Sequence, residues 1–248
     1  MEIKDSHVPK GFTAITSEQM YRIENNGETV CSMNKILMME NAGSRVADFL
    51  ISEFGNDITT KSIVAICGKG NNGGDAMVAI RHLQGYMFSM IDIGPNSSLT
   101  VILLCNPTDL KTTEAKSNWD IIERMKSINT LVYNQDNINE IEKKIEESHI
   151  ILDGILGTGI KGKMREPYSM VIECINKNKG KAFIVAIDFP SGTDPDTGLL
   201  AEKSVMADVT ITFHRLKSGH SIGSKSPGRL IVDKIGIPYE AERGVIQE

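Results

Sequence analysis

The sequence predicts an α/β protein with a parallel or mostly parallel, doubly wound sheet. Short apolar runs alternate with segments of helical period along most of the chain. Runs such as 100–105 (TVILLC) and 183–188 (FIVAID) are apolar almost throughout, which is typical of strands buried on both faces of a sheet. Strands that alternate with helices in this way indicate a parallel sheet with helices packed against it.

The order of the elements follows from this periodicity and from local capping signals. Thr16 and Gln19 fit a capping box at the start of a first helix that is expected to end near Asn25-Asn26-Gly27. Pro167 suits the start of the helix over 168–176. The predicted helices cover 17–26, 33–54, 74–83, 112–126, 138–147 and 168–176. The predicted strands cover 63–67, 100–105, 130–133, 149–156, 183–188, 207–213 and 230–232.

The length and composition exclude several classes of protein. The chain has 248 residues without a linker, repeat or low-complexity tract, so residues 1–248 are predicted to form one domain, with a loose polar arm at 1–12. A net charge of −5 argues against a nucleic-acid-binding protein. The first ten residues lack the apolar segment of a secretory signal, and no run of about 18 apolar residues occurs. We therefore expect a cytoplasmic protein without a membrane-spanning segment.

Two local features can be explained by a structural role as well as by a functional one. The cysteines are widely spaced without a C-x-x-C pair, and buried free thiols are expected in preference to disulfides or a metal site; they are Cys31, Cys67, Cys105 and Cys174. Gly43 lies inside the predicted helix 33–54, where glycine costs roughly 1 kcal/mol relative to alanine. Close packing or a ligand would explain this glycine, and the sequence leaves both open.

The first of three polar loops, GKGNNGGD at 68–75, joins a predicted strand to a predicted helix. Gly68, Gly70 and Gly73 fit the dinucleotide-binding pattern G-x-G-x-x-G in its required strand-to-helix context. Glycines let a phosphate approach the backbone, and a helix that starts near Gly74 would direct its N–H groups at that anion.

A standard NAD site also needs an acidic residue at the end of the second strand. That strand ends in Cys105-Asn106-Pro107, which disfavours an NAD-dependent dehydrogenase. A glycine turn shaped only by tight packing is the structural alternative.

The second loop, DGILGTGIKGK at 153–163, resembles the phosphate loop of nucleotide hydrolases. Met164 stands where that loop has the Ser or Thr that binds Mg²⁺, which disfavours an NTPase. The backbone N–H groups and Lys161 or Lys163 can still bind phosphate. Asp153 ends the preceding strand, and a buried carboxylate there needs a cation or hydrogen-bond donors to stay ionised. The alternative role for Asp153 is to cap a helix or the loop.

The third loop, DFPSGTD at 188–194, places Asp188 at a strand end shortly before Ser191. A weak likeness to a calcium loop follows at Asp194 and Asp196, but the required Gly and distal Glu are missing. In doubly wound sheets ligands bind beyond the carboxyl ends of the strands, so the three loops together predict one site. Four histidines lack metal-ligand spacing and are expected to be structural or superficial: His82, His149, His214 and His220.

Four motifs in fixed order resemble the NAD(P)H-hydrate epimerase family, also known as the YjeF N-terminal domain. They are GKGNNGGD, DGILGTG, IDFPSG, and ADVTITF followed by Lys217. MENAG at 39–43 and IVDKIGIP at 231–238 are also similar, so the resemblance covers about 14–238. It implies a three-layer αβα sandwich with a Rossmann-like sheet, usually a homodimer. It also implies an isomerase that interconverts the R and S forms of NADHX and NADPHX at C6, and a separate dehydratase that repairs the S form.

The resemblance assigns roles by motif. The implied substrate-binding residues are Asn71, Asn72, Gly73, Gly74, Asp75, Gly157, Thr158, Gly159, Ile160, Lys161, Gly162, Lys163, Tyr168 and Asp188. The implied ligands of one potassium ion per subunit are Asn72, Asp153 and Ser191, which supply the oxygen atoms that a hard cation prefers. Asp188 is expected to act as acid/base with Lys217 as its partner, through water loss or through ring opening.

This chain departs from the family pattern at two places. Ala76 follows GGD where the family usually has Gly, and Leu216 precedes Lys217 where the family usually has Pro. The second departure bears on the role of Lys217. A non-catalytic nucleotide-binding or scaffold protein on the same fold is the alternative function, and it predicts loss of the polar loop residues, which are present here.

Overall fold

Seven strands form one parallel sheet in the part of the chain that the structure describes. The computed structural model describes residues 13–89, 98–157, 164–221 and 228–246. The strands are β1 (Ser62–Cys67), β2 (Ser98–Leu103), β3 (Ile128–Val132), β4 (Ile150–Gly154), β5 (Phe183–Ile187), β6 (Val209–Phe213) and β7 (Arg229–Asp233). Their order is β3-β2-β1-β4-β5-β6-β7, and every neighbouring pair is parallel. The predicted doubly wound sheet is confirmed, and its strand order reverses between β1 and β4, where such sheets bind ligands.

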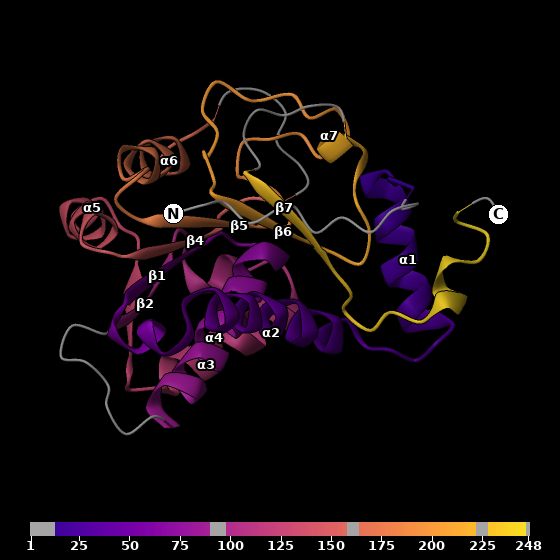
Figure 1. The fold of residues 1–248 in the computed structure, drawn as a ribbon, viewed down its shortest axis with the longest axis horizontal. Helices are drawn as coiled ribbons and strands as arrows, with labels where there is room; N and C mark the ends of the chain where they lie inside the picture. The colour runs from indigo at the N-terminus through magenta and orange to yellow at the C-terminus, as the bar shows by residue number, and fades with distance from the viewer. Residues whose placement is uncertain (1–12, 90–97, 158–163, 222–227, 247–248) are drawn as a thin grey trace.

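Helices cover both faces of this sheet (Figure 1). They are α1 (Ser17–Thr29), α2 (Lys35–Phe54), α3 (Asn71–Ser89), α4 (Thr113–Arg124), α5 (Ile138–Glu146), α6 (Tyr168–Lys177) and the short α7 (Ser218–Ser221), with 3-10 turns η1 (Gly55–Thr60), η2 (Pro107–Asp109) and η3 (Tyr239–Glu242). Side chains alternate along each strand: Ala65 packs in the core beneath α2, α3 and α4, whereas Val64 packs in the core beneath α5 and α6. The predicted three-layer αβα sandwich is therefore confirmed.

Helix α1 lies at the carboxyl-end edge of the sheet and is tied there by long-range hydrogen bonds. Its capping box is present as predicted, with Thr16 and Gln19 exchanging bonds. Ile15 N–H donates to the Leu216 carbonyl at 2.8 Å, and Ser218 N–H donates to the Ile15 carbonyl at 2.8 Å. The start of α1 is therefore fixed beside Lys217. The helix runs beyond the predicted stop, because Gly27 is buried against Met38.

Several predicted boundaries are wrong, among them the end of the helix predicted over 74–83, since α3 continues to Ser89. Helix α3 begins at Asn71, three residues before the predicted start near Gly74, so the polar residues of the first loop form its opening turn. Strand β2 ends at Leu103, which leaves Cys105 half-buried beyond the strand. The four cysteines are free, and Cys67 and Cys174 are buried. Within the described ranges, no helix has the length and apolar character needed to cross a membrane.

Close packing explains Gly43. This glycine lies where α2 crosses α3, and a Cβ added to it would come within 2.4 Å of the Val78 Cβ and 2.6 Å of the Asp75 carbonyl oxygen. Both contacts are with α3, so a side chain at position 43 would push apart the helix that carries the first polar loop.

Gly43→Ala should therefore lower the free energy of unfolding by about 1–3 kcal/mol, because overpacking outweighs the gain in helix propensity. The matched control is Gly85→Ala, also inside a helix but with no atom within 4 Å of the added Cβ. That control should raise stability by about 0.5–1 kcal/mol. Urea denaturation of both variants checks this, and equal stability of the two would contradict it.

Candidate active site

The three polar loops meet at the carboxyl ends of β1, β4 and β5, which are neighbours in the sheet. Gly68 N–H donates to the Gly154 carbonyl at 2.9 Å, and a Cβ on Gly68 would lie 1.7 Å from the Ile155 carbonyl oxygen. Only glycine permits this approach, so the first and second loops pack directly on each other. The prediction that the loops converge is correct for the residues that the structure describes.

Asp153 and Ser191 form a fully buried polar pair between β4 and β5. The Ser191 hydroxyl donates to Asp153 Oδ1 at 2.5 Å, and Ser191 N–H donates to Oδ2 at 2.7 Å. Burial raises the pKa of Asp153 to about 6, although the bonds from Ser191 and Ile155 oppose this effect. Across the described ranges no Lys, Arg or His forms an ion pair with Asp153.

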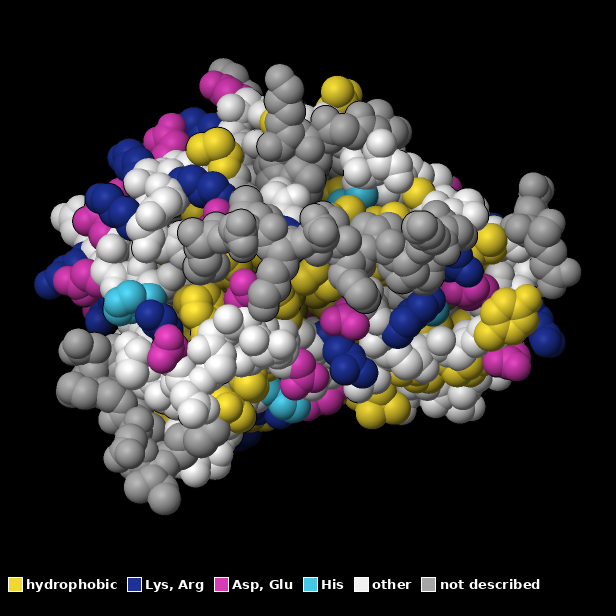
Figure 2. Space-filling model, in the orientation of Figure 1, with side chains coloured by type: hydrophobic (Ala, Val, Ile, Leu, Met, Phe, Trp, Pro, Cys, Tyr) yellow, Lys and Arg dark blue, Asp and Glu magenta, His cyan; other side chains and the backbone are white. Residues whose placement is uncertain are grey.

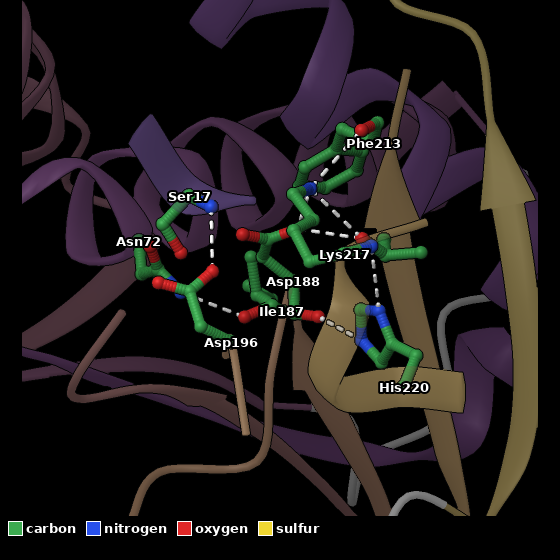
Figure 3. Close-up of polar contacts among 9 residues, drawn as sticks. Ser17, Asn72, Ile187, Asp188, Asp196, Phe213, Lys217 and His220 are labelled. Atoms are coloured by element: carbon green, nitrogen blue, oxygen red, sulfur yellow. Dashed lines mark hydrogen bonds and ion pairs between the residues drawn. The ribbon is translucent and has the colours of Figure 1, made fainter. Parts of the chain in front are cut away.

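Asn72 lies next to this pair, on the first turn of α3. Its amide Nδ2 donates to the Ile187 carbonyl at 2.7 Å (Figure 3). Its Oδ1 lies so close to Gly157 that a Cβ there would come within 2.4 Å. Asn72 therefore bridges the tips of β4 and β5, and an amide oxygen, a carboxylate and a hydroxyl gather in one place. These are the oxygen donors that hard cations prefer.

Asp188 and Lys217 form the second polar centre (Figure 3). Lys217 Nζ donates to Asp188 Oδ1 at 2.5 Å, and the Thr212 hydroxyl donates to the same oxygen at 2.7 Å. The Lys217 side chain is 3% exposed and the Asp188 side chain 15%. Asp188 has φ of 63°, a left-handed conformation that is uncommon for residues other than glycine and that clusters at functional sites.

The charge states within this centre are defined by its contacts. Burial would raise the pKa of Asp188, but the Lys217 charge and the hydrogen bonds from Lys217 and Thr212 hold it below the ordinary value. Lys217 N–H donates to His220 Nδ1, so that nitrogen is an acceptor and His220 is neutral, with Nε2 facing the Asp188 carbonyl at 3.1 Å. Burial and the Lys217 charge lower the pKa of His220 to about 4. His220 is thus a neutral support under an ionised Asp188.

Two adjoining pockets open over these centres. One, of about 170 Å³, is lined by Ser17, Met20, Tyr21, Glu24, Asn71, Asn72, Asp75, Asp188, Phe213 and Lys217. The other, of about 290 Å³, is lined by Lys69, Gly70, Asn71, Asn72, Gly73, Lys111, Thr112, Ile155, Leu156 and Gly157. They share Asn71 and Asn72, so the start of α3 separates a pocket rich in carboxyl groups from a pocket with two lysines.

Most of the predicted site residues belong to this region. Asn71 to Asp75, Gly157, Asp188 and Lys217 line or adjoin the pockets, although Gly74 packs against Met39. Tyr168 instead lies half-buried against the core under α5 and α6, and it is not among the described residues that line either pocket. The predicted ligands from Thr158 to Lys163 lie outside the described residues.

Several residues of the site were not predicted from the sequence. Glu24 and Lys111 are far from the three loops in sequence, and only the fold brings them close. Lys69 lies within the first motif but was given no role. Thr212 could have been found, because a threonine in an apolar buried strand suggests a polar partner. His220 was expected to be structural or superficial, and it contacts Asp188 directly.

Comparison with known proteins agrees with this geometry. A profile of the family described as YjeF-related protein N-terminus matches residues 35–219, so the chain belongs to that family. A protein of Nitrosopumilus maritimus named NAD(P)H-hydrate epimerase is 42% identical over 232 residues, which cover 94% of this chain and 99% of the relative. A protein of Cenarchaeum symbiosum with the same name has the same identity and coverage.

Two other matches place the fold in a wider context. The Bifunctional NAD(P)H-hydrate repair enzyme of Methanothermobacter thermautotrophicus is 37% identical over 84% of this chain, which corresponds to 37% of that protein. The crystal structure of the yeast protein ynu0 superposes with a TM-score of 0.68 and 25% identity, covering 87% of this chain and 86% of the yeast chain.

The buried ion pair makes stability depend on pH in a defined way. Lys217→Met leaves the Asp188 carboxylate buried without a cation, which should lower the free energy of unfolding by about 3–5 kcal/mol at pH 7.5. In that variant the folded-state pKa of Asp188 rises above its unfolded value. The deficit relative to the parent protein should therefore shrink as the pH falls toward about 4, where the carboxyl takes up a proton.

Urea denaturation at pH 7.5 and pH 4.5 tests this expectation. The double variant Asp188→Asn/Lys217→Met is the control, because it has no buried charge and its deficit should not vary in this way. An equal deficit of the single variant at both pH values would contradict the account.

Proposed function

We propose that this chain is an NAD(P)H-hydrate epimerase, an isomerase that interconverts the R and S forms of NADHX and NADPHX at C6. The observation that carries the proposal is the buried Asp188–Lys217 pair at the 170 Å³ pocket, next to an anion-binding helix start. The names of the two relatives that match over nearly their whole length support the same activity.

The two pockets suit the two ends of this substrate. The 290 Å³ pocket offers Lys69, Lys111 and the start of α3 to the diphosphate. The 170 Å³ pocket then receives the hydrated nicotinamide ring, since Asn71 and Asn72 line both pockets and the substrate spans them.

The chemistry at C6 requires proton transfer to and from oxygen. C6 bears a hydroxyl group and the ring nitrogen, and inversion needs one of these bonds to break and re-form on the opposite face. Asp188, held ionised by Lys217, accepts a proton, and the positive charge of the buried Lys217 ammonium stabilises negative charge that develops nearby. The neutral His220 and Thr212 hold this pair in place.

Potassium is the proposed cofactor, one ion per subunit. Asn72, Asp153 and Ser191 supply the oxygen donors, and Asp153 lacks a cationic partner within the described ranges. When bound, the ion would supply positive charge that keeps Asp153 ionised beside the substrate diphosphate. Asp153 and Ser191 themselves fix the tips of β4 and β5 relative to each other.

The wider setting of the reaction is also part of the proposal. The S form is consumed by a dehydratase activity, in line with the bifunctional name of the Methanothermobacter relative. A homodimer in the cytoplasm is the proposed state. On the face in Figure 2, basic side chains are interspersed with acidic ones, as suits a protein whose partner is a small molecule.

The direct test supplies purified R-NADPHX and follows the S form by chromatography, with and without potassium. We expect epimerisation well above the uncatalysed rate, with stimulation by potassium. The apparent potassium affinity should weaken as the pH falls below about 6, because protons compete for Asp153. Asp153→Asn should remove this pH dependence. A flat trace under both conditions would favour the non-catalytic scaffold instead.

A further inference from the structure

Asp75 is a buried carboxyl group without a partner of its own among the residues that the structure describes. It lies on the second turn of α3 and is only 8% exposed. Within the described ranges no hydrogen bond or ion pair reaches its carboxyl group, although most buried polar groups are satisfied. It lines the 170 Å³ pocket and also a 60 Å³ pocket toward α2, so its free face is directed at the space where the ring is proposed to bind.

The charged groups around Asp75 come from every neighbouring element. Glu24 of α1, Asp188 at the tip of β5 and Lys217 share the larger pocket with it. Lys35 of α2 and Glu114 of α4 share the smaller one, and Lys35 is engaged by Glu28 at 3.7 Å. The larger pocket therefore holds three carboxyl groups and one ammonium group, and that ammonium is bonded to Asp188.

This environment shifts the pKa values of two carboxyl groups in opposite directions. Burial, and then the negative charges of Asp188 and Glu24, raise the pKa of Asp75 well above its ordinary value, and Lys217 opposes this only in part. Lys217 and Thr212 hold the pKa of Asp188 low. Two carboxyl groups whose pKa values are pushed apart in one pocket are suited to act as acid and base.

We propose that Asp75 is the acid that gives its proton to the C6 hydroxyl of the bound hydrate, with Glu24 as the second carboxyl group that faces it from α1. This inference rests on the proposed function and adds two residues to its machinery: a proton donor, Asp75, and a positioning residue, Glu24. It also selects water loss over ring opening as the route of inversion.

The step balances in protons and electrons. The Asp75 proton moves to the C6 hydroxyl, the C6–O bond breaks, and its electron pair leaves with water. The ring-nitrogen lone pair forms the C6=N bond of an iminium cation, which the carboxylates of Asp75 and Asp188 stabilise. Water then adds to the opposite face of C6, the C=N electrons return to nitrogen, and Asp188 takes the proton that this water releases. Proton exchange with solvent afterwards returns Asp75 to its protonated form and Asp188 to its ionised form.

Two variants and one control test this role. Asp75→Asn keeps the shape but cannot donate the proton, so kcat should fall by about 10²–10⁴-fold with KM nearly unchanged. Glu24→Gln removes a charge that raises the pKa of Asp75, so the basic limb of the kcat–pH profile should move to lower pH. Glu114→Gln, which changes only the smaller pocket, should leave both kcat and this limb unchanged.

Each outcome separates this inference from the proposed function. If the parent enzyme is active, a fully active Asp75→Asn variant would overturn the role of Asp75. A Glu24→Gln variant whose kcat–pH profile keeps its basic limb at the parent pH would overturn it as well. An inactive parent enzyme would instead overturn the proposed function. Carboxyl ¹³C NMR of the free protein adds a readout that needs no activity: Asp75 should be protonated at pH 7, and an ionised Asp75 there would overturn the inference.

Discussion

The buried ion pair between Asp188 and Lys217 is the interaction on which the site depends. It joins the tip of β5 to the segment after β6, and the backbone of that same segment is hydrogen-bonded to Ile15 at the start of α1. The pair therefore fixes both the floor and one wall of the 170 Å³ pocket. Because a buried charge is costly without its partner, the left-handed conformation of Asp188 and the position of α1 are maintained by the same electrostatic constraint.

Three buried aspartates in this site differ because their surroundings differ. Asp188 has a cation that holds its pKa low, and Asp153 has hydrogen-bond donors and a pKa of about 6. Asp75 has neither among the described residues, and its pKa is raised well above its ordinary value. The sheet explains their closeness, since the strand order reverses between β1 and β4 and brings loops from distant parts of the sequence together. One residue type in three surroundings therefore suits the proposed base, the proposed cation ligand and the proposed acid.

Local patterns in the sequence were enough to predict the αβα layers and the capping box of α1, because periodicity and capping depend on neighbouring residues. The loops at the strand tips were also predictable, since parallel strands place their carboxyl ends on one edge. The proposed role of Glu24 could not be predicted, because it depends on α1 docking against residues about 200 positions away in the chain. The start of α3 at Asn71 was missed because successive glycines and asparagines obscure the helical pattern, and tertiary packing overrides their low propensity.

The most direct measurement is the rate of epimerisation of R-NADPHX by Asp188→Asn at saturating substrate. We expect a kcat at least about 100-fold below that of the parent protein, with the fold intact by circular dichroism, because the amide cannot accept the proton. Asp233→Asn, a strand-end change at β7 outside both pockets, should keep the parent rate. A fully active Asp188→Asn variant would contradict the account.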